Sequence, residues 1–118
     1  MWLCDPRILC RRHLLGEHLE CHMFLGTLKR KISVSGYIRN NCFCPLELEA
    51  RHNCLAEEMI SRGYDHKSNL IIPENLFDYL PNVEQNATIN KESSLSDLLS
   101  RCPYCRERYN KIERNNKI

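Results

Sequence analysis

The spacing of apolar and polar positions predicts a long amphipathic helix near the start of the chain, over the segment HLLGEHLECHMFLGTL. Apolar residues recur there at helical intervals, at Leu14, Cys21, Leu25 and Leu28. A stripe of this kind is how a helix packs against a core. Gly16 costs a helix interior about 1 kcal/mol relative to alanine, so we expect something to approach the backbone closely at this position.

A second helical pattern follows Pro45, in the segment LELEARHNCLAEEMISRG. Its apolar face is formed by Leu48, His52, Leu55 and Met59. Gly63 predicts the end of this helix, because glycine readily adopts the left-handed backbone that closes one. Asp5 and Pro6 predict the cap and the first residue of a short opening helix. Residues 29–44 predict a loop or a broken helix between the two patterns.

The second half of the chain carries weaker signals. Residues 73–80 predict a short helix bounded by two prolines, and residues 82–94 predict a flexible connection because apolar residues are few. Ser94 or Ser96 is expected to cap a last helix, which leads into the segment RCPYC. From Lys111 onward the tail is polar and is expected to fray.

These patterns predict an all-α fold, a small single-layer helical domain of three to four helices with short connections. The length of 118 residues suits one domain, and the hydrophobic share of 42% and charged share of 27% are ordinary for a globular protein. No apolar run approaches the roughly 20 residues of a membrane span, and charged residues interrupt the N-terminal apolar segment that a signal peptide would need. We therefore expect a soluble, monomeric, intracellular protein, in a host cell or a bacterial cytoplasm, that does not bind a membrane.

Basic side chains gather at both ends of the first predicted helix, although the formal net charge is only +2. The residues concerned are Arg11, Arg12, Lys29, Arg30 and Lys31. Two interpretations remain open at this point. The residues form solvated faces, or they form local patches that bind an anionic polymer.

One group of polar residues on the first helix could carry acid–base chemistry. His13, Glu17 and Glu20 are spaced so that all three project from one helical face. A carboxylate flanked by apolar residues can act as an acid or a base with an imidazole beside it. The alternative is an ordinary charge ladder on the surface.

The eight cysteines predict thiols or metal ligands, because disulfides are rare inside cells. Cys102 and Cys105 have the spacing of a zinc knuckle, with the pair at positions 42 and 44 as candidate partners. The alternative, which we adopt, is a tight turn with small buried thiols. His18 and His22, four residues apart, could present a pair to a metal or could simply pack. We expect no metal and no cofactor, with zinc at Cys102 and Cys105 as the alternative.

The segment LCRRHLLGEHLECHMFLGTL, followed by RHNCLAEEMISRGYDHKS, resembles the pyrimidine dimer DNA glycosylase family of the phage endonuclease V type. The resemblance covers roughly Trp2 to Ser68. It implies a helical fold, a family-like core over residues 1–68 and a divergent C-terminal part over residues 69–118. It also implies that the partner is damaged double-stranded DNA.

The resemblance further implies a glycosylase that also cleaves abasic sites. In the family the N-terminal α-amine attacks C1′ of the damaged nucleotide, and the resulting imine permits β-elimination of the strand. An α-amine suits this step because its ordinary pKa, about 7.7–8.0, leaves a useful neutral fraction near pH 7. The family's catalytic glutamate falls on Glu20 and its nearby histidine on His13, which places the amine provisionally on Met1. The implied DNA-binding set is Arg11, Arg12, Glu17, His18, His22, Lys29, Arg30 and Lys31.

Two features of this chain depart from the family pattern. Family members begin with a small residue, typically threonine, and then a basic one before the position that Met1 occupies. The start could lie upstream, Met1 could reach the site by a local shift, or catalysis could be lost. The family's aromatic C-terminal segment is replaced here by the CPYC region, which leaves the lesion open. The alternative function is therefore a catalytically impaired nucleic-acid-binding module of the same fold, with or without a stabilising zinc ion. A third is a helical protein whose ligand is not DNA.

Overall fold

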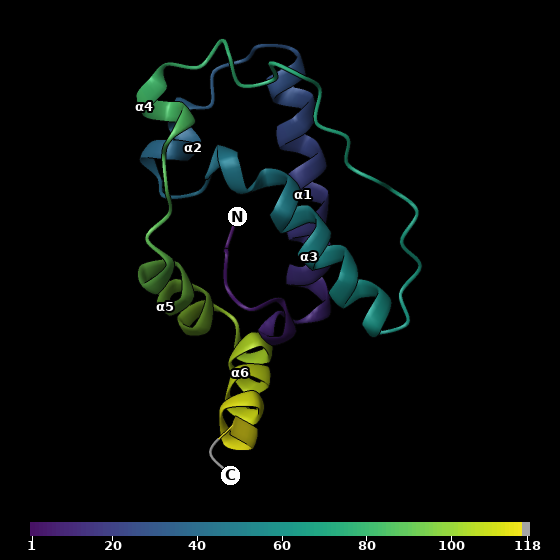
Figure 1. Ribbon diagram of the computed structural model, residues 1–118. Coiled ribbons are helices and arrows are strands. Elements are labelled where there is room, and N and C mark those ends of the chain that lie inside the picture. The colour runs from purple at the N-terminus through teal and green to yellow at the C-terminus, as the bar shows by residue number, and fades with distance from the viewer. Residues whose placement is uncertain (117–118) are drawn as a thin grey trace.

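Helices α1 (Arg11–Lys29) and α3 (Leu48–Ser61) pack against each other more extensively than any other pair of elements (Figure 1). A computed structural model describes residues 1–116 of the protein. Both were predicted from the sequence, and both are preceded by a short 3-10 turn, η1 (Pro6–Ile8) before α1 and η2 (Pro45–Glu47) before α3. Asp5 caps η1 by accepting a hydrogen bond of 3.0 Å from the backbone N–H of Arg7, as predicted. Gly63 ends α3 with a positive φ of 82°.

The apolar stripe predicted on α1 is confirmed. Leu14, Cys21, Leu25 and Leu28 are all buried. On the same helix, Phe24 stacks on Phe43 with ring centroids 4.0 Å apart, which ties α1 to the loop before η2. Gly16 differs from expectation, because no neighbouring atom lies within 4 Å of a Cβ built on its backbone. No part of the described chain therefore approaches α1 closely at this glycine.

The connection between α3 and α4 (Asn82–Gln85) has no helix over residues 64–81, so the helix predicted over residues 73–80 is wrong. The reason is local. Asn75 adopts a left-handed backbone with φ of 64°, which breaks a helix, and the segment instead buries Leu76 and Leu80 through turns. Another short helix, α2 (Ser35–Arg39), lies in the segment predicted as a broken helix.

Helix α5 (Lys91–Arg101) begins earlier than predicted, within the segment expected to be flexible. Its cap is Asn90, whose side chain accepts from the N–H of Ser93 at 3.0 Å, so the predicted serine caps are wrong. Ser94 instead donates its hydroxyl to the carbonyl of Trp2 at 2.9 Å. Helix α6 (Pro103–Asn116) continues past Lys111, where fraying was expected.

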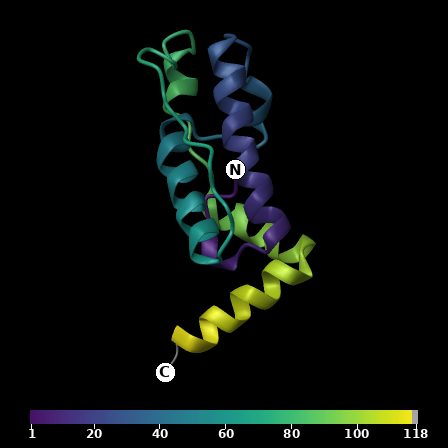
Figure 2. The same cartoon turned by 90° about the vertical axis from the view of Figure 1, so that its right-hand side faces the viewer.

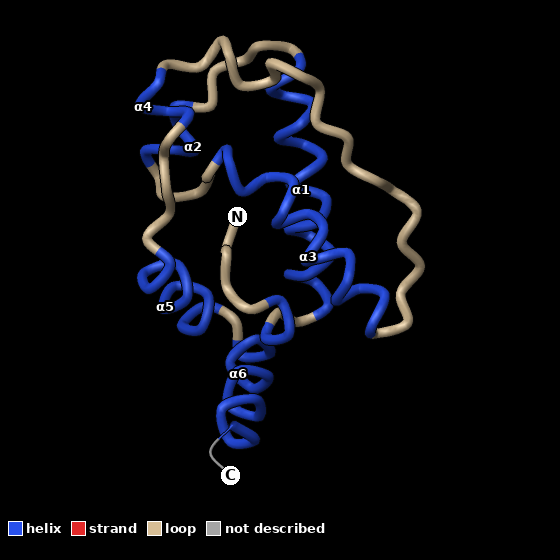
Figure 3. The backbone as a smooth tube through the Cα atoms, in the orientation of Figure 1, coloured by secondary structure: helices blue, strands red, loops and turns tan. Residues whose placement is uncertain are grey.

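The all-α prediction is confirmed: residues 1–116 contain helices and loops but no strand (Figure 3). Four helices are long (α1, α3, α5 and α6), and α2 and α4 are single turns. The N-terminus lies at the centre of the molecule, among α1, α2, α3 and α5 (Figure 1). Helix α6 projects from one end of the molecule (Figures 1 and 2). Within the described range, the longest apolar helical stretch falls short of what a bilayer crossing would need.

Candidate active site

A cleft surrounds the N-terminus and is bordered by α1, by the loop after α2 and by α5. Its volume is about 600 Å³. The residues lining it are Met1, Trp2, Glu20, Asn40, Asn41, Cys42, Ser93, Ser94, Asp97 and Arg101. Seven of these ten residues carry an amide, a hydroxyl or a charged side chain, so the wall can bind a polar ligand.

The α-amine of Met1 lies in this cleft and forms an ion pair with the carboxylate of Glu20. The amine also donates a hydrogen bond of 3.1 Å to the carbonyl of Cys42. The side chain of Met1 is completely buried, whereas that of Glu20 is 36% exposed. The buried side chain anchors the amine, and the carboxylate remains open to a ligand in the cleft.

Two further contacts hold the N-terminal segment in place. Ser94 on α5 binds the carbonyl of Trp2, and Arg51 on α3 donates to the carbonyl of Cys4 at 2.6 Å. Between them, Leu3 has a positive φ of 54°, a conformation that a non-glycine residue adopts only where its surroundings hold it. The position of the amine is thus set by contacts from α1, α3 and α5.

Glu17 does not share the environment of Glu20. It is 3% exposed and forms a bidentate salt bridge with Arg51, whose Nη2 lies 2.9 Å from Glu17 Oε1. Burial alone would lower the pKa of Arg51, but the hydrogen bonds and charge of Glu17 outweigh it and raise that pKa. A direct contact between Glu17 and DNA, expected from the sequence, does not fit this geometry, because its carboxylate is enclosed and already paired.

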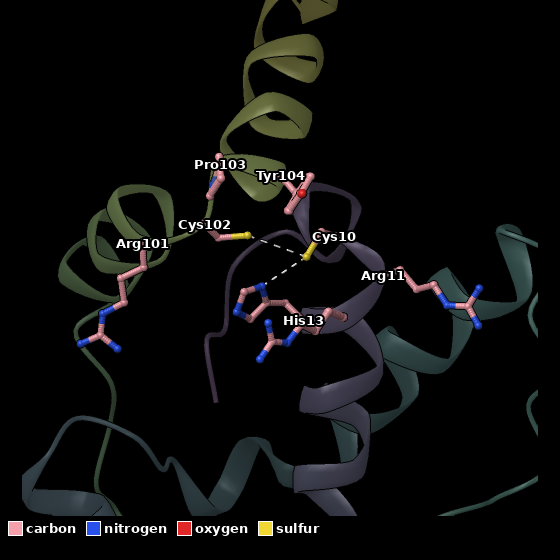
Figure 4. Close-up of a pocket in the computed structure, with 8 residues that line it drawn as sticks. Cys10, Arg11, His13, Arg101, Cys102, Pro103 and Tyr104 are labelled. Atoms are coloured by element: carbon pink, nitrogen blue, oxygen red, sulfur yellow. Dashed lines mark hydrogen bonds between the residues drawn. The ribbon is translucent and has the colours of Figure 1, made fainter.

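His13 also faces away from both carboxylates. Its Nδ1 lies 3.2 Å from Cys10 Sγ (Figure 4) and 3.4 Å from Cys105 Sγ. The three residues predicted to share one acid–base face therefore bind three different partners. His13 contacts Trp2, which lines the cleft, with the two rings edge to face and their centroids 6.0 Å apart.

The cysteine cluster differs in part from expectation. Cys102 and Cys105 are buried thiols at the tight turn between α5 and α6, as predicted. Their neighbours are Cys10 and His13. The predicted partner Cys42 lies elsewhere, where its thiol donates a hydrogen bond to the carbonyl of Asn40. Sequence reasoning missed Cys10, although Cys10 and His13 have the same three-residue spacing as Cys102 and Cys105.

His18 and His22 join a cluster of four imidazoles between α1, α3 and the connection that follows α3. The other two members are His52 and His66, and Nε2 of His66 lies 2.9 Å from Nε2 of His18. His52 also lies 3.0 Å from the carbonyl of Ser68. Burial, together with the three neighbouring rings, lowers the pKa of His18 to about 4. Because His18 is only 9% exposed, it packs inside and does not form part of a DNA-binding surface.

The five basic residues predicted to bind phosphates are all exposed. They lie at opposite ends of α1, with Glu20 between them. Arg12 and Arg30 are eighteen residues apart, five helical turns, so they lie on one side of α1, about 80° around the helix from Glu20. Arg11 lies on the side opposite Glu20, pointing away from the cysteine cluster, with its guanidinium 5.1 Å from the centre of the Tyr64 ring (Figure 4).

Comparison with known proteins gives one match. A family model described as pyrimidine dimer DNA glycosylase matches residues 1–72, which include Met1, Glu20 and the whole of α1 and α3. No curated protein and no solved structure matches the chain.

Proposed function

Because the chain belongs to the pyrimidine dimer DNA glycosylase family, we propose that it removes a damaged base from double-stranded DNA and then cleaves the strand at the abasic site. The observation that carries the proposal is the ion pair between the Met1 α-amine and the Glu20 carboxylate in an open polar cleft. The pair combines a nucleophile with an acid–base group, which is the minimum that imine chemistry requires.

The proposed reaction begins with transfer of a proton from the amine to Glu20. The nitrogen lone pair then forms a bond to C1′ of the damaged nucleotide, and the glycosidic electron pair leaves with the base. The departing base takes a proton from the nitrogen now bonded to C1′, and Glu20 gives its proton to O4′ as the sugar ring opens. The product is an iminium ion, whose positive charge the Glu20 carboxylate stabilises. Removal of a proton from C2′ then expels the 3′ phosphate and breaks the strand.

The volume and the polar side chains of the cleft support access for a displaced nucleotide. Enzymes that act on a base in a duplex must take it out of the stack, and they hold it with polar and stacking contacts. Asn41 is one of the polar residues in the wall of the cleft, and two hydrogen bonds hold its side chain in place. The side chain accepts from the N–H of Asn90 at 2.7 Å and donates to Ser93 Oγ at 3.3 Å. These contacts fasten the loop after α2 to the start of α5 across the cleft.

Arg12 and Arg30 are the proposed phosphate contacts on the side of α1 that is closer to Glu20. They lie about 12 Å and 15 Å along the helix axis on either side of Glu20. A duplex that lies along α1 would bring phosphates to both ends and a nucleotide to the cleft between them. Neutralising phosphates with arginines supplies affinity that does not depend on base sequence.

The test is borohydride trapping on a duplex oligonucleotide with a single abasic site, followed by mass mapping of the adduct. We would use the chain as printed and a chain with Thr-Arg added before Met1. A covalent adduct on Met1 supports the proposal directly, and an adduct only with the extended chain moves the nucleophile to the added threonine. No adduct with either chain would overturn the lyase proposal and favour a binding module of the same fold.

Excision of the base needs a second substrate, a duplex with one thymine dimer. We expect the chain to cleave a glycosidic bond of the dimer and to cleave none in the undamaged duplex. Cleavage of the abasic duplex alone would limit the activity to the lyase step.

A further inference from the structure

We propose that Cys10, His13, Cys102 and Cys105 bind one zinc ion, which fastens the C-terminal helices to the start of α1. The proposal does not depend on the catalytic role of Met1 and Glu20. It rests on the four ligand atoms, which come from two distant parts of the chain and lie within 4.8 Å of one another.

The distances between these atoms match those of a tetrahedral zinc site. Zinc–sulfur bonds of about 2.3 Å at tetrahedral angles place two sulfurs about 3.8 Å apart, and a sulfur and a nitrogen slightly closer. The Cys10 and Cys102 sulfurs are 3.8 Å apart. His13 Nδ1 lies 3.2 Å from Cys10 Sγ and 3.4 Å from Cys105 Sγ. One ion can therefore reach all four atoms with only small side-chain adjustments.

The types of ligand favour zinc. Three thiols and an imidazole form one of the sets that structural zinc sites use, and each pair here has two intervening residues. A disulfide does not fit, because its sulfurs would be about 2.05 Å apart, and all eight cysteines lie within the described residues as free thiols. Cys102 and Cys105 are buried, which indicates a closed structural site.

The backbone around the cluster stabilises negatively charged sulfur. The N–H groups of Cys10 and Cys105 donate to the sulfurs of Cys105 and Cys102 at 3.2 Å and 3.4 Å. Cys10 caps the N-terminus of α1, and Cys105 lies in the first turn of α6, so the positive ends of two helix dipoles lie near the thiols.

Arginines complete the electrostatic surroundings. A cavity of about 400 Å³ beside the cluster is lined by Arg11, Arg12 and Arg101, together with Tyr104 (Figure 4). Zinc with three thiolates and a neutral imidazole would carry one negative charge, which the guanidinium group of Arg12, a residue that lines this cavity, would partly offset. The site thus has charges that complement the bound ion as well as suitable ligands.

The position of the site gives it a structural task. It joins the first turn of α1 to the junction of α5 and α6, more than 90 residues later in the chain. Helix α5 supplies Asp97 and Arg101 to the wall of the cleft, and the His13 ring packs against Trp2 next to the N-terminal amine. The ion would therefore keep the α5 wall of the cleft at a constant position relative to the N-terminal amine.

The first experiment measures metal in the purified full-length chain by mass spectrometry and titrates the metal-free chain with Co²⁺. We expect one zinc per chain, and a cobalt spectrum with tetrahedral d–d bands and thiolate-to-metal charge transfer. A metal-free chain with no cobalt spectrum would overturn the proposal. Cobalt binding without thiolate charge transfer would place the metal at the imidazole cluster and would also overturn it.

Two matched variants locate the ligands. Cys105→Ser is expected to lose zinc, while Cys54→Ser, which removes a thiol from α3, is expected to retain it. Retention of zinc by Cys105→Ser would contradict the assignment. If Cys105→Ser does not fold, the Tm of the unmodified chain is measured with and without a strong chelator. We expect a lower Tm without metal. An unchanged Tm would overturn the structural role of the ion.

Discussion

At the scale of single residues, Glu17 and Glu20 show how position decides what a carboxylate does. They lie three residues apart on α1, but Glu17 is enclosed with Arg51 while Glu20 opens to the cleft. Removing one member of a buried ion pair typically costs about 3–5 kcal/mol, because the remaining charge has no partner. We therefore expect Glu17 to contribute to stability, whereas Glu20 is the residue that we propose for the chemistry.

Glu20→Gln should abolish strand cleavage and borohydride trapping while leaving DNA affinity within about two-fold. Glutamine keeps the shape of the side chain but can neither accept the amine's proton nor stabilise the iminium charge. Trapping assays and fluorescence anisotropy on an abasic duplex measure the two effects separately. Unchanged trapping would remove Glu20 from the mechanism, and a lower Tm would show that the ion pair is structural.

Arg12→Ala should weaken DNA binding and make it less sensitive to salt, because each phosphate contact contributes about 0.9 to the slope of log affinity against log salt. Arg11→Ala is the matched control, since Arg11 lies opposite Glu20 and against Tyr64. We expect it to leave the slope nearly unchanged. Equal losses from both variants would contradict the orientation proposed for the duplex.

At the scale of helices, one glycine lies inside α1 and another follows the end of α3, and the two can be tested as a pair. Gly16→Ala should stabilise the protein by about 0.5–1 kcal/mol, because the added methyl meets no neighbour and the unfolded chain loses freedom. Gly63→Ala should destabilise it, because alanine at a φ of 82° is strained. Urea unfolding measures both.

A stabilised Gly16→Ala chain that binds DNA poorly would show that the open backbone of α1 is kept for the nucleic acid. The opposite order, with Gly16→Ala the less stable of the two variants, would contradict the packing described here.

At the scale of the whole molecule, the imidazole cluster joins α1, α3 and the connection after α3, and it makes stability depend on pH. His18, which faces His22, His52 and His66, has a folded pKa of about 4, below its ordinary value of 6.5. Between these values the unfolded chain binds more protons. The contribution of His18 to stability is therefore complete above about pH 6.5 and declines as the pH falls toward 4.

The measurement is the free energy of unfolding in urea at several values between pH 7.5 and pH 4.5. The chain should lose stability across this range, and His18→Gln should lose less of it over the same interval. Both measurements are made on metal-free protein, so that release of zinc does not contribute. Equal pH slopes for the two chains would contradict the shift assigned to His18.

The sequence by itself determined the elements whose signals are local. The two principal helices, the cap at Asp5 and the stop at Gly63 follow from spacing and capping within a few residues, and the resemblance pointed to Glu20 and the N-terminal amine. The turns at residues 73–80 were missed because the proline-bounded apolar pattern was weighed above Asn75, although asparagine is one of the residues that adopt the left-handed backbone found there.

Only the tertiary structure decided which side chains meet. Spacing on a helix indicates which residues share a face, but it says nothing about a partner many residues away. Glu17 met Arg51 across 34 residues, and Cys10 met Cys102 across 92. Such pairs depend on how the helices pack as bodies, and that packing is set by the whole core, beyond what any one segment of sequence contains.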